Sequence, residues 1–256
     1  MKDGLPEALV RDIVALRGEH QLILVHGGGD IVTEISTRLG HPPKFVQSPK
    51  GFKSRYTDKD ESGIYTMVMA GKINKEIVTM LEKNGVASIG LSGLDAHIIK
   101  AERKKQLIIL DERGRRRLIE GGYTGQIKSV NTELLTALLD LGVLPVISPI
   151  AQGDMYEALN VDGDRTASAI ASALNADRLI LLTDVKGIML NGAIVPHLSV
   201  RQAEESLEKI GPGMITKAYA AVEALKKGVD EAIIASGLIT SPLGDALGHV
   251  ECTVIS

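Results

Sequence analysis

The sequence contains a single cysteine, Cys252, which excludes an internal disulfide and a metal site built from cysteines. We expect Cys252 to be a small apolar residue in a C-terminal strand. The sequence also has no apolar stretch of the length that spans a membrane, and its N-terminus has no apolar core of a signal peptide. These absences predict a cytoplasmic protein with no membrane partner.

An excess of basic residues is missing as well. The chain has 29 lysines and arginines against 32 acidic residues, so its formal net charge is −3. Proteins that bind nucleic acid or anionic lipid through their overall field carry a net positive charge. We therefore expect no nucleic-acid partner, and an acidic protein partner would have to meet a local basic patch.

What the chain does have is a regular alternation of apolar strands and helices. With 256 residues, 44% of them hydrophobic, it is long enough for one large α/β domain or two lobes. Apolar strands are expected at 22–25, 86–91, 143–148, 179–183 and 231–235, and helices at 5–16, 29–39, 59–84, 131–140, 164–175, 200–209 and 214–227. Fully apolar strands separated by helices are typical of a mostly parallel sheet covered on both faces, a three-layer α/β sandwich.

No clean linker divides the sequence. We expect a single domain over 1–256, with an N-terminal lobe of about 1–150 and a C-terminal lobe of about 151–256. The N-terminal lobe is predicted to carry a hairpin at 44–57 and additional strands at 98–101, 107–110 and 117–119.

The turn after the first apolar strand contains three glycines, Gly27, Gly28 and Gly29, and leads into a helix. Glycine lets backbone N–H groups approach an anion closely, and a helix presents its positive end there. A carboxylate or phosphate is therefore expected at Gly28 and Gly29. Taken alone, the same residues would also make an ordinary tight turn.

A second polar segment, Asn160-Val161-Asp162-Gly163-Asp164, lies where a strand gives way to a helix. Asp164 is well placed to cap that helix, and a cap alone would explain it. The segment resembles the start of a calcium loop, but no glutamate stands at the required later position and no helix precedes it. We therefore predict no dedicated metal site there.

Two segments of the second half have the composition of a nucleotide site. Thr183 and Asp184 end an expected strand, where ligands of open α/β sheets bind. Gly211 and Gly213 open a helix that carries Lys217 in its first turn. Backbone donors beside a lysine suit a phosphoryl group, although a single helical lysine is usually a solvated surface charge.

Five motifs together resemble the amino acid kinase family, in its order and spacing and over essentially the whole chain. They are His-Gly-Gly-Gly at 26–29, Gly-Leu-Ser-Gly-Leu-Asp at 90–95, Asn-Val-Asp-Gly-Asp at 160–164, Thr-Asp-Val-Lys-Gly at 183–187 and Gly-Pro-Gly-Met-x-x-Lys at 211–217. The resemblance implies phosphorylation of an acid with ATP and Mg²⁺ and no covalent intermediate. It also implies that Mg²⁺ is carried mainly by phosphate oxygens and water.

The resemblance assigns a role to each site residue. Gly28 and Gly29 would hold the substrate carboxylate, Arg55 would bind the other acidic group, and Asn160 would bind the substrate backbone. Catalysis would rest on Lys217, which neutralises charge on the phosphoryl group, and on Asp164, which organises the site. The nucleotide site would be formed by Thr183, Asp184, Gly211, Gly213 and Met214.

Two further motifs point to one branch of the family. Residues 48–58 read Ser-Pro-Lys-Gly-Phe-Lys-Ser-Arg-Tyr-Thr-Asp, and residues 121–125 read Gly-Gly-Tyr-Thr-Gly. They resemble the kinases of archaeal lysine and arginine biosynthesis whose substrate, α-aminoadipate or glutamate, is attached through its amino group to a small acidic carrier protein of the LysW type. The alternatives are an N-acetylglutamate kinase and an inactive homologue that binds nucleotide and carrier. A homo-oligomer, as a dimer, is expected.

The sequence departs from the family pattern at two points. The family begins with a strand ending in Lys-x-Gly-Gly, whose lysine lies opposite Lys217, and the chain begins at Met1 without a counterpart. A start placed too far downstream is our preferred explanation over a truncated relic or a non-catalytic protein, because every other motif is retained. In addition, Arg165 stands where the branch usually has glutamine.

Docking of an acidic carrier requires a local cationic surface, and three clusters are candidates. They are Lys44/Lys50/Lys53, Arg103/Lys104/Lys105 and Arg113/Arg115/Arg116/Arg117. Solvated hairpin charges are the alternative, and we favour that alternative for the third cluster. The first cluster adjoins Arg55 in sequence, so Lys50 and Lys53 are the leading candidates.

Overall fold

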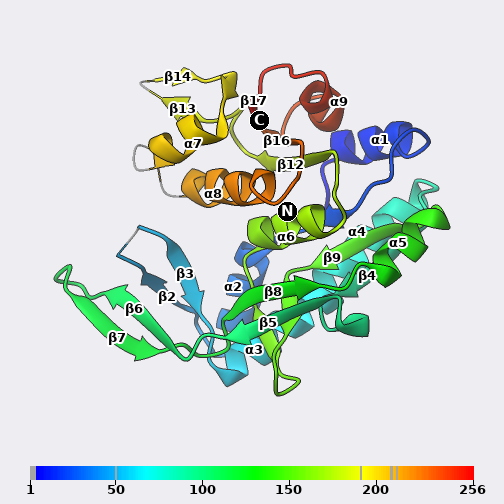
Figure 1. The fold of residues 1–256 in the computed structure, drawn as a ribbon. Helices are drawn as coiled ribbons and strands as arrows, with labels where there is room; N and C mark the ends of the chain where they lie inside the picture. The colour runs from blue at the N-terminus through cyan, green and yellow to red at the C-terminus, as the bar shows by residue number, and fades with distance from the viewer. Residues whose placement is uncertain (1–3, 50, 191, 208–209, 212) are drawn as a thin grey trace. The chain divides into compact units, whose positions relative to one another are not determined.

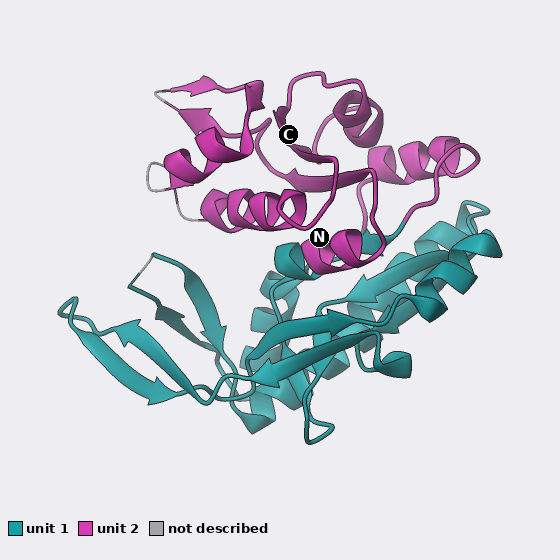
Figure 2. Ribbon diagram, viewed as in Figure 1, with its two compact units in different colours: residues 1–4, 23–166 teal, residues 5–22, 167–256 magenta. Residues whose placement is uncertain are grey.

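The structure is a computed structural model that describes residues 4–49, 51–190, 192–207, 210–211 and 213–256. The chain forms two compact units (Figure 2). Among the described residues, unit 1 comprises Gly4 and residues 23–166, and unit 2 comprises residues 5–22 and 167–256. The chain thus passes from unit 1 to unit 2 within helix α6 (Gly163–Ala173), rather than near residue 150, and the first helix belongs with the C-terminal part.

Unit 1 contains a three-stranded parallel sheet in the order β1-β9-β4. Its strands are β1 (Leu24–Val25), β9 (Leu144–Ser148) and β4 (Ser88–Ser92), and the whole of β9 is buried. In this register both Val25 and Leu91 lie opposite Ile147. The carboxyl ends of β1 and β4 therefore meet at one edge of the sheet, which is where ligands bind in such folds. The helices of this unit include α2 (Gly29–Arg38), α4 (Asn74–Lys83) and α5 (Glu133–Asp140).

The long helix expected at 59–84 is divided into three segments. Helix α3 (Lys59–Thr66) begins at its cap Asp58, whose Oδ1 accepts the Glu61 N–H at 2.9 Å. A π-helix, η1 (Met67–Ile73), follows and leads into α4. Apolar spacing cannot distinguish a π-turn from an α-turn, and π-helical segments are often found at functional sites. The predicted end of the helix is confirmed, because Gly85 adopts φ +76° there.

A second sheet of unit 1 has the order β11-β10-β5-β8. Its strands are β11 (Ala158–Asn160), β10 (Ile150–Gln152), β5 (Ile99–Arg103) and β8 (Gly125–Val130). The sequence did not predict β8 or β10, because β8 is largely polar and exposed and β10 has only three residues. A short 3₁₀ turn, η2 (Asp95–His97), precedes β5.

Two antiparallel hairpins complete unit 1 (Figure 1). The first confirms the hairpin predicted at 44–57, and the second pairs the strands predicted at 107–110 and 117–119. The first pairs β2 (Lys44–Gln47) with β3 (Lys53–Tyr56), and the second pairs β6 (Gln106–Leu110) with β7 (Arg116–Glu120). In the first hairpin Phe45 lies opposite Arg55, so the hairpin places Arg55 on its second strand.

Unit 2 is a three-layer α/β arrangement around a sheet of order β12-β16-β17-β15. Helix α8 (Met214–Leu225) packs through its alanines on one face, against apolar side chains that include Leu181 and Ile234. Helix α9 (Pro242–Leu247) contributes Ala246 to the core on the other face, with Ile233. The strands are β12 (Arg178–Thr183), β16 (Glu231–Ser236), β17 (Thr253–Ile255) and β15 (His197–Leu198).

The remaining elements of unit 2 are mostly short. Asp12 of α1 (Glu7–Leu16) accepts the Leu243 N–H at 2.7 Å and so holds the start of α9. Helix α7 (Val200–Ser206) packs on α8, and β13 (Met189–Leu190) pairs with β14 (Ala193–Ile194). The sequence missed β13, β14, β15 and α9 because segments of two to six residues are too short for a periodic pattern. Cys252 is buried, as expected, but it lies directly before β17 rather than within a strand.

The expected fold class is confirmed, because helices pack on the parallel β1-β9-β4 sheet of unit 1 and on the mixed, mainly parallel β12-β16-β17-β15 sheet of unit 2. Within the described part of the chain, no helix combines the length and the apolar composition that crossing a membrane requires.

Candidate functional site

The glycine turn of unit 1 joins β1 to α2. Gly28 is the N-cap of α2 and has φ +152°, a conformation that only glycine adopts easily. A Cβ at Gly28 would collide with Ile73 Cδ1 and would lie 3.1 Å from Met69 Sδ. Both neighbours belong to the π-helix η1, so Gly28 is required by its own backbone and by the packing of that segment.

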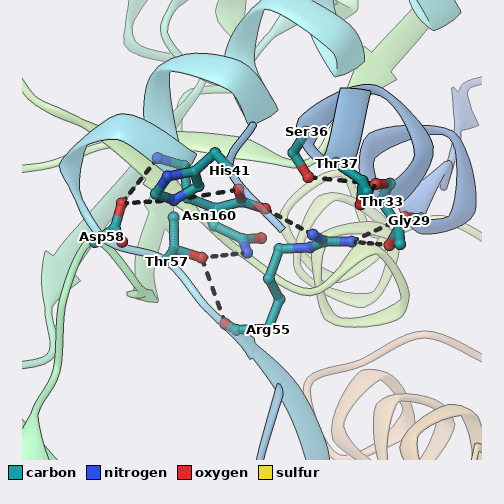
Figure 3. Close-up of polar contacts among 10 residues, drawn as sticks. Gly29, Thr33, Ser36, Thr37, His41, Arg55, Thr57, Asp58 and Asn160 are labelled. Carbon is teal, nitrogen blue, oxygen red and sulfur yellow. Dashed lines mark hydrogen bonds and ion pairs between the residues drawn. The ribbon is translucent and has the colours of Figure 1, made fainter. Parts of the chain in front are cut away.

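Arg55 extends from β3 to this turn, as Figure 3 shows. Its guanidinium donates from NH2 to Gly29 O at 2.9 Å and to Thr33 Oγ1 at 2.6 Å, and from NH1 to Glu61 Oε1 at 2.6 Å. Only 9% of Arg55 is exposed. Since a guanidinium has five N–H donors, these three bonds leave donors for a ligand. The structure thus places Arg55 beside Gly29. Two residues that act on the same ligand would have to lie this close together.

Glu61 is the acidic partner that the sequence did not reveal. It is 1% exposed, and its Oε2 accepts no hydrogen bond from the described residues. His41 Nε2 lies 3.9 Å from that oxygen and 3.3 Å from Asp58 Oδ1 (Figure 3). A glutamate three residues after a capping aspartate is typical of an ordinary helix start. The sequence position of Glu61 therefore did not predict its ion pair with Arg55.

Asn160, the last residue of β11, is linked to the strand that carries Arg55. Its Nδ2 donates to Thr57 Oγ1 at 2.9 Å, and this hydroxyl donates to Arg55 O at 3.4 Å (Figure 3). The predicted substrate residues of unit 1 therefore form one connected cluster: Gly28, Gly29, Arg55 and Asn160.

The predicted capping role of Asp164 is wrong. Asp162 caps α6 instead, since its Oδ1 accepts the Arg165 N–H at 2.9 Å. Asp164 lies in the first turn of the helix, because α6 already begins at Gly163. A cap therefore does not account for Asp164. Nearby, burial and the charge of Asp162 raise the pKa of Tyr65.

Unit 2 carries the remaining predicted residues, beginning with Thr183 and Asp184. Thr183 ends β12 opposite Ser236, the last residue of the parallel strand β16. Its hydroxyl donates to Asp184 Oδ1 at 3.0 Å, and its carbonyl accepts the Gly237 N–H at 2.7 Å. Thr183 and Asp184 thus lie at the carboxyl edge of the sheet, where a ligand is expected.

The other glycine turn precedes α8. Gly213 is the N-cap of α8 with φ +91°, and the Ile215 N–H donates to Gly211 O at 3.2 Å. Met214 is the first residue of the helix and Lys217 lies in its first turn, at the positive end of the helix dipole. Pro212 of this motif lies outside the described residues.

The donor groups of these two turns could serve an anion rather than a metal ion. No group of three or more His, Cys, Asp or Glu side chains suited to a metal ion is found in the part of the chain that the structure describes. Backbone donors at two helix N-termini, with Arg55 in unit 1 and Lys217 in unit 2, would each suit a carboxylate or phosphate.

Comparison with known proteins identifies the family of the chain. The profile described as the amino acid kinase family matches residues 2–236. A relative from Cenarchaeum symbiosum, whose name gives the activity provisionally, is 56% identical over 91% of this chain and 88% of its own length. The [LysW]-aminoadipate/[LysW]-glutamate kinase of Metallosphaera sedula is 50% identical over the same shares of both chains.

A solved structure gives the same result for the fold. The crystal structure of smu.665 from Streptococcus mutans UA159 superposes with a TM-score of 0.79 at 25% identity, covering 98% of this chain and 93% of that chain. The profile match and these identities extend over most of the chain, which belongs to the amino acid kinase family.

Proposed function

We propose that this protein is an ATP-dependent kinase that phosphorylates the side-chain carboxylate of α-aminoadipate or glutamate attached to an acidic carrier protein. The product is an acyl phosphate. Such a product of aminoadipate would serve lysine biosynthesis, and that of glutamate would serve arginine biosynthesis. The observation that carries the proposal is the connection between Arg55 and the glycine turn, made by the hairpin whose 48–58 motif is typical of the carrier-dependent branch.

On the acyl side, the Gly28 and Gly29 N–H groups would bind one carboxylate of the substrate. Arg55 would bind a second acidic group with the donors that Glu61, Gly29 and Thr33 leave available. Asn160, held by Thr57, would bind the substrate backbone. This arrangement restrains the attacking carboxylate, and positioning of this kind is a large part of phosphoryl-transfer catalysis.

On the nucleotide side, Thr183, Asp184 and the Gly211–Met214 turn would hold ATP. The described residues fit a phosphate, because none of them lies within 4 Å of the place where a Cβ of Gly213 would be, and a helix N-terminus follows. Lys217 would neutralise charge on the phosphoryl group during transfer, and Asp164 would orient the catalytic groups. When bound with ATP, Mg²⁺ supplies charge neutralisation on the phosphate oxygens.

The charged hairpins are candidates for docking the carrier. Lys53 is exposed on β3, with its Nζ 5.0 Å from the centre of the Phe45 ring. Lys50, the other leading candidate, lies outside the described residues. Arg103 is less available, since its Nε donates to Gly122 O at 2.6 Å and its Cζ lies 4.0 Å from the centre of the Tyr123 ring. Lys53 therefore remains our first choice for steering the carrier.

The test uses the longest protein that the gene encodes, incubated with ATP, Mg²⁺ and carrier charged with aminoadipate or with glutamate. Acyl phosphate is trapped with hydroxylamine as the hydroxamate. We expect hydroxamate with at least one charged carrier and little with free N-acetylglutamate. Turnover of N-acetylglutamate alone would transfer the assignment to an N-acetylglutamate kinase, and no turnover of any substrate would favour a non-catalytic homologue.

A further inference from the structure

A buried histidine precedes the glycine turn of unit 1. His26 is 3% exposed, and its Nδ1 lies 2.9 Å from Gly27 O. Its Nε2 lies 3.2 Å from Nδ2 of Asn74, which is fully buried at the start of α4. Neither side chain has a role in the function proposed above, yet both are polar groups in the interior beside Gly28.

The surroundings of Asn74 determine which atoms of this pair donate. Its Nδ2 faces Val146 O at 2.9 Å, and its Oδ1 faces the Lys75 Nζ at 3.2 Å. A carbonyl requires a donor and an ammonium requires an acceptor, so the orientation of the Asn74 amide is fixed. Nδ2 is therefore a donor toward His26 Nε2 as well, and that nitrogen must be the unprotonated one.

A neutral His26 then carries its proton on Nδ1 and donates it to Gly27 O. Burial lowers the pKa of His26, with the bond to Gly27 acting in the opposite direction, so the neutral ring is favoured. Among the described residues, Lys75 is the charged group that contacts the Asn74 side of this pair. Its ammonium also donates to Gly90 O at 2.7 Å.

The bond to Gly27 O has a consequence for the turn. A trans peptide is planar, with its C=O and N–H pointing in opposite directions. The peptide that His26 holds by the Gly27 carbonyl therefore presents the Gly28 N–H on the other side. The next peptide is held similarly, because Gly28 O accepts the Val32 N–H at 3.1 Å. In the described chain, neither Gly28 nor Gly29 donates its own N–H to another residue.

We propose that His26 and Asn74 are positioning residues, which lock the Gly27–Gly28 peptide so that its N–H faces the bound carboxylate of the substrate. The inference rests on the proposed function and adds to it the group that orients the anion site. The π-helix η1 contributes because Asn74 follows it directly and lies beside β9 and β4, where its Nδ2 is 2.9 Å from Val146 O and 3.4 Å from Leu91 O.

The proposal also explains Gly90 in the Gly-Leu-Ser-Gly-Leu-Asp motif. A Cβ at this position would collide with Asn74 Oδ1 and would lie 2.7 Å from Lys75 Nζ. Gly90 therefore leaves the space in which the Asn74 amide is held.

The test compares two substitutions, each of which places an amide group near a different nitrogen of the His26 ring. His26→Asn keeps a donor near the position of Nδ1, whereas His26→Gln places its amide near Nε2 and loses the donor to Gly27. We expect the KM for charged carrier to stay within about threefold of wild type for His26→Asn and to rise roughly tenfold for His26→Gln, the loss expected for one hydrogen bond. The KM for ATP should stay constant in both variants.

Equal KM values for charged carrier in the two variants and the wild type would overturn the proposal. A second measurement does not depend on folding of the variants or on activity: ¹⁵N NMR of the wild-type histidines at neutral pH. We expect His26 to be protonated at Nδ1 and not at Nε2, and the opposite tautomer or a doubly protonated ring would contradict the inference. A wild type that is inactive on charged carrier would instead reject the proposed function, and the tautomer would still be decided by the spectrum.

Discussion

The two glycine turns of the molecule differ in how they are surrounded. In unit 1, Gly28 is enclosed by Met69 and Ile73, and buried side chains hold the carbonyls on either side of it. In unit 2, Gly213 also has a positive φ, of +91°, but among the described residues a Cβ there would meet no atom within 4 Å. Both turns begin a helix, and the first is held by side chains from distant parts of the chain.

This difference indicates that the two turns bind different kinds of ligand. A turn fixed by buried side chains holds its N–H groups in place before a ligand arrives, which suits a small carboxylate that must be oriented for attack. A turn in open space can accept a larger polyphosphate. Substitutions around the first turn should therefore affect stability and acyl-substrate binding together, whereas those around the second should affect nucleotide use and phosphoryl transfer, with a smaller effect on stability.

The largest expected effect is on stability, from Glu61→Gln. The change leaves the buried Arg55 guanidinium without its counter-charge, and removing one partner of a buried ion pair costs about 3–5 kcal/mol. Urea unfolding measures the loss. The control is Glu205→Gln, which breaks the exposed Arg201–Glu205 pair of unit 2 and should change the free energy of unfolding by less than about 1 kcal/mol. Equal effects of the two changes would show that the Arg55 pair does not hold the first turn.

Lys217→Gln should have the largest effect on catalysis. Removing an electrostatic donor of the transferring phosphoryl group lowers kcat by about 10²–10³. The control is Lys227→Gln, an exposed lysine just beyond the end of α8, which should leave kcat unchanged. Steady-state kinetics on charged carrier tests both variants. A kcat for Lys217→Gln within threefold of wild type would remove this residue from catalysis.

Gly28→Ala and Gly213→Ala compare the two turns directly. Both place a side chain in a left-handed conformation, which costs about 1–2 kcal/mol. Only the first also forces a methyl group into Ile73, and such overpacking adds about 1–3 kcal/mol. We expect Gly28→Ala to be the less stable variant in thermal unfolding. Equal melting temperatures would mean that the first turn is as open as the second.

The features of the site that could be predicted are those with a local signature. Gly28, Gly29 and Gly213 follow or precede a regular element, and the 44–57 hairpin shows its alternation in sequence. The buried partners could not be predicted, because their contacts join distant residues. Asn74 is 48 positions from His26, and neither has a pattern that points to the other.

Two predictions of local structure were wrong because the sequence fits two alternatives equally well. Asp162 and Asp164 are both plausible caps by residue type, and only the actual start of α6 at Gly163 selects Asp162. Similarly, apolar residues at 67–73 fit an α-helix as well as the π-helix that is found.

The smallest expected effect concerns the carrier. Changing Lys50 and Lys53 to glutamate should raise the KM for charged carrier, more at low salt than at high salt, because steering charges are screened over about 8 Å at physiological ionic strength. The KM for ATP should not change. The control is Arg113→Glu with Arg116→Glu, on the exposed second hairpin. An unaltered KM for carrier in the lysine variant, with the fold intact, would exclude the first hairpin from the docking surface.

The most direct test of the account is which turn responds to which ligand. ¹H–¹⁵N NMR of protein labelled on glycine would follow the amides of Gly28, Gly29, Gly211 and Gly213 during titration. Carrier charged with aminoadipate or glutamate should shift Gly28 and Gly29, and a non-hydrolysable ATP analogue with Mg²⁺ should shift Gly211 and Gly213. Charged carrier that shifts the unit 2 glycines and leaves Gly28 and Gly29 unchanged would contradict the assignment of the two turns.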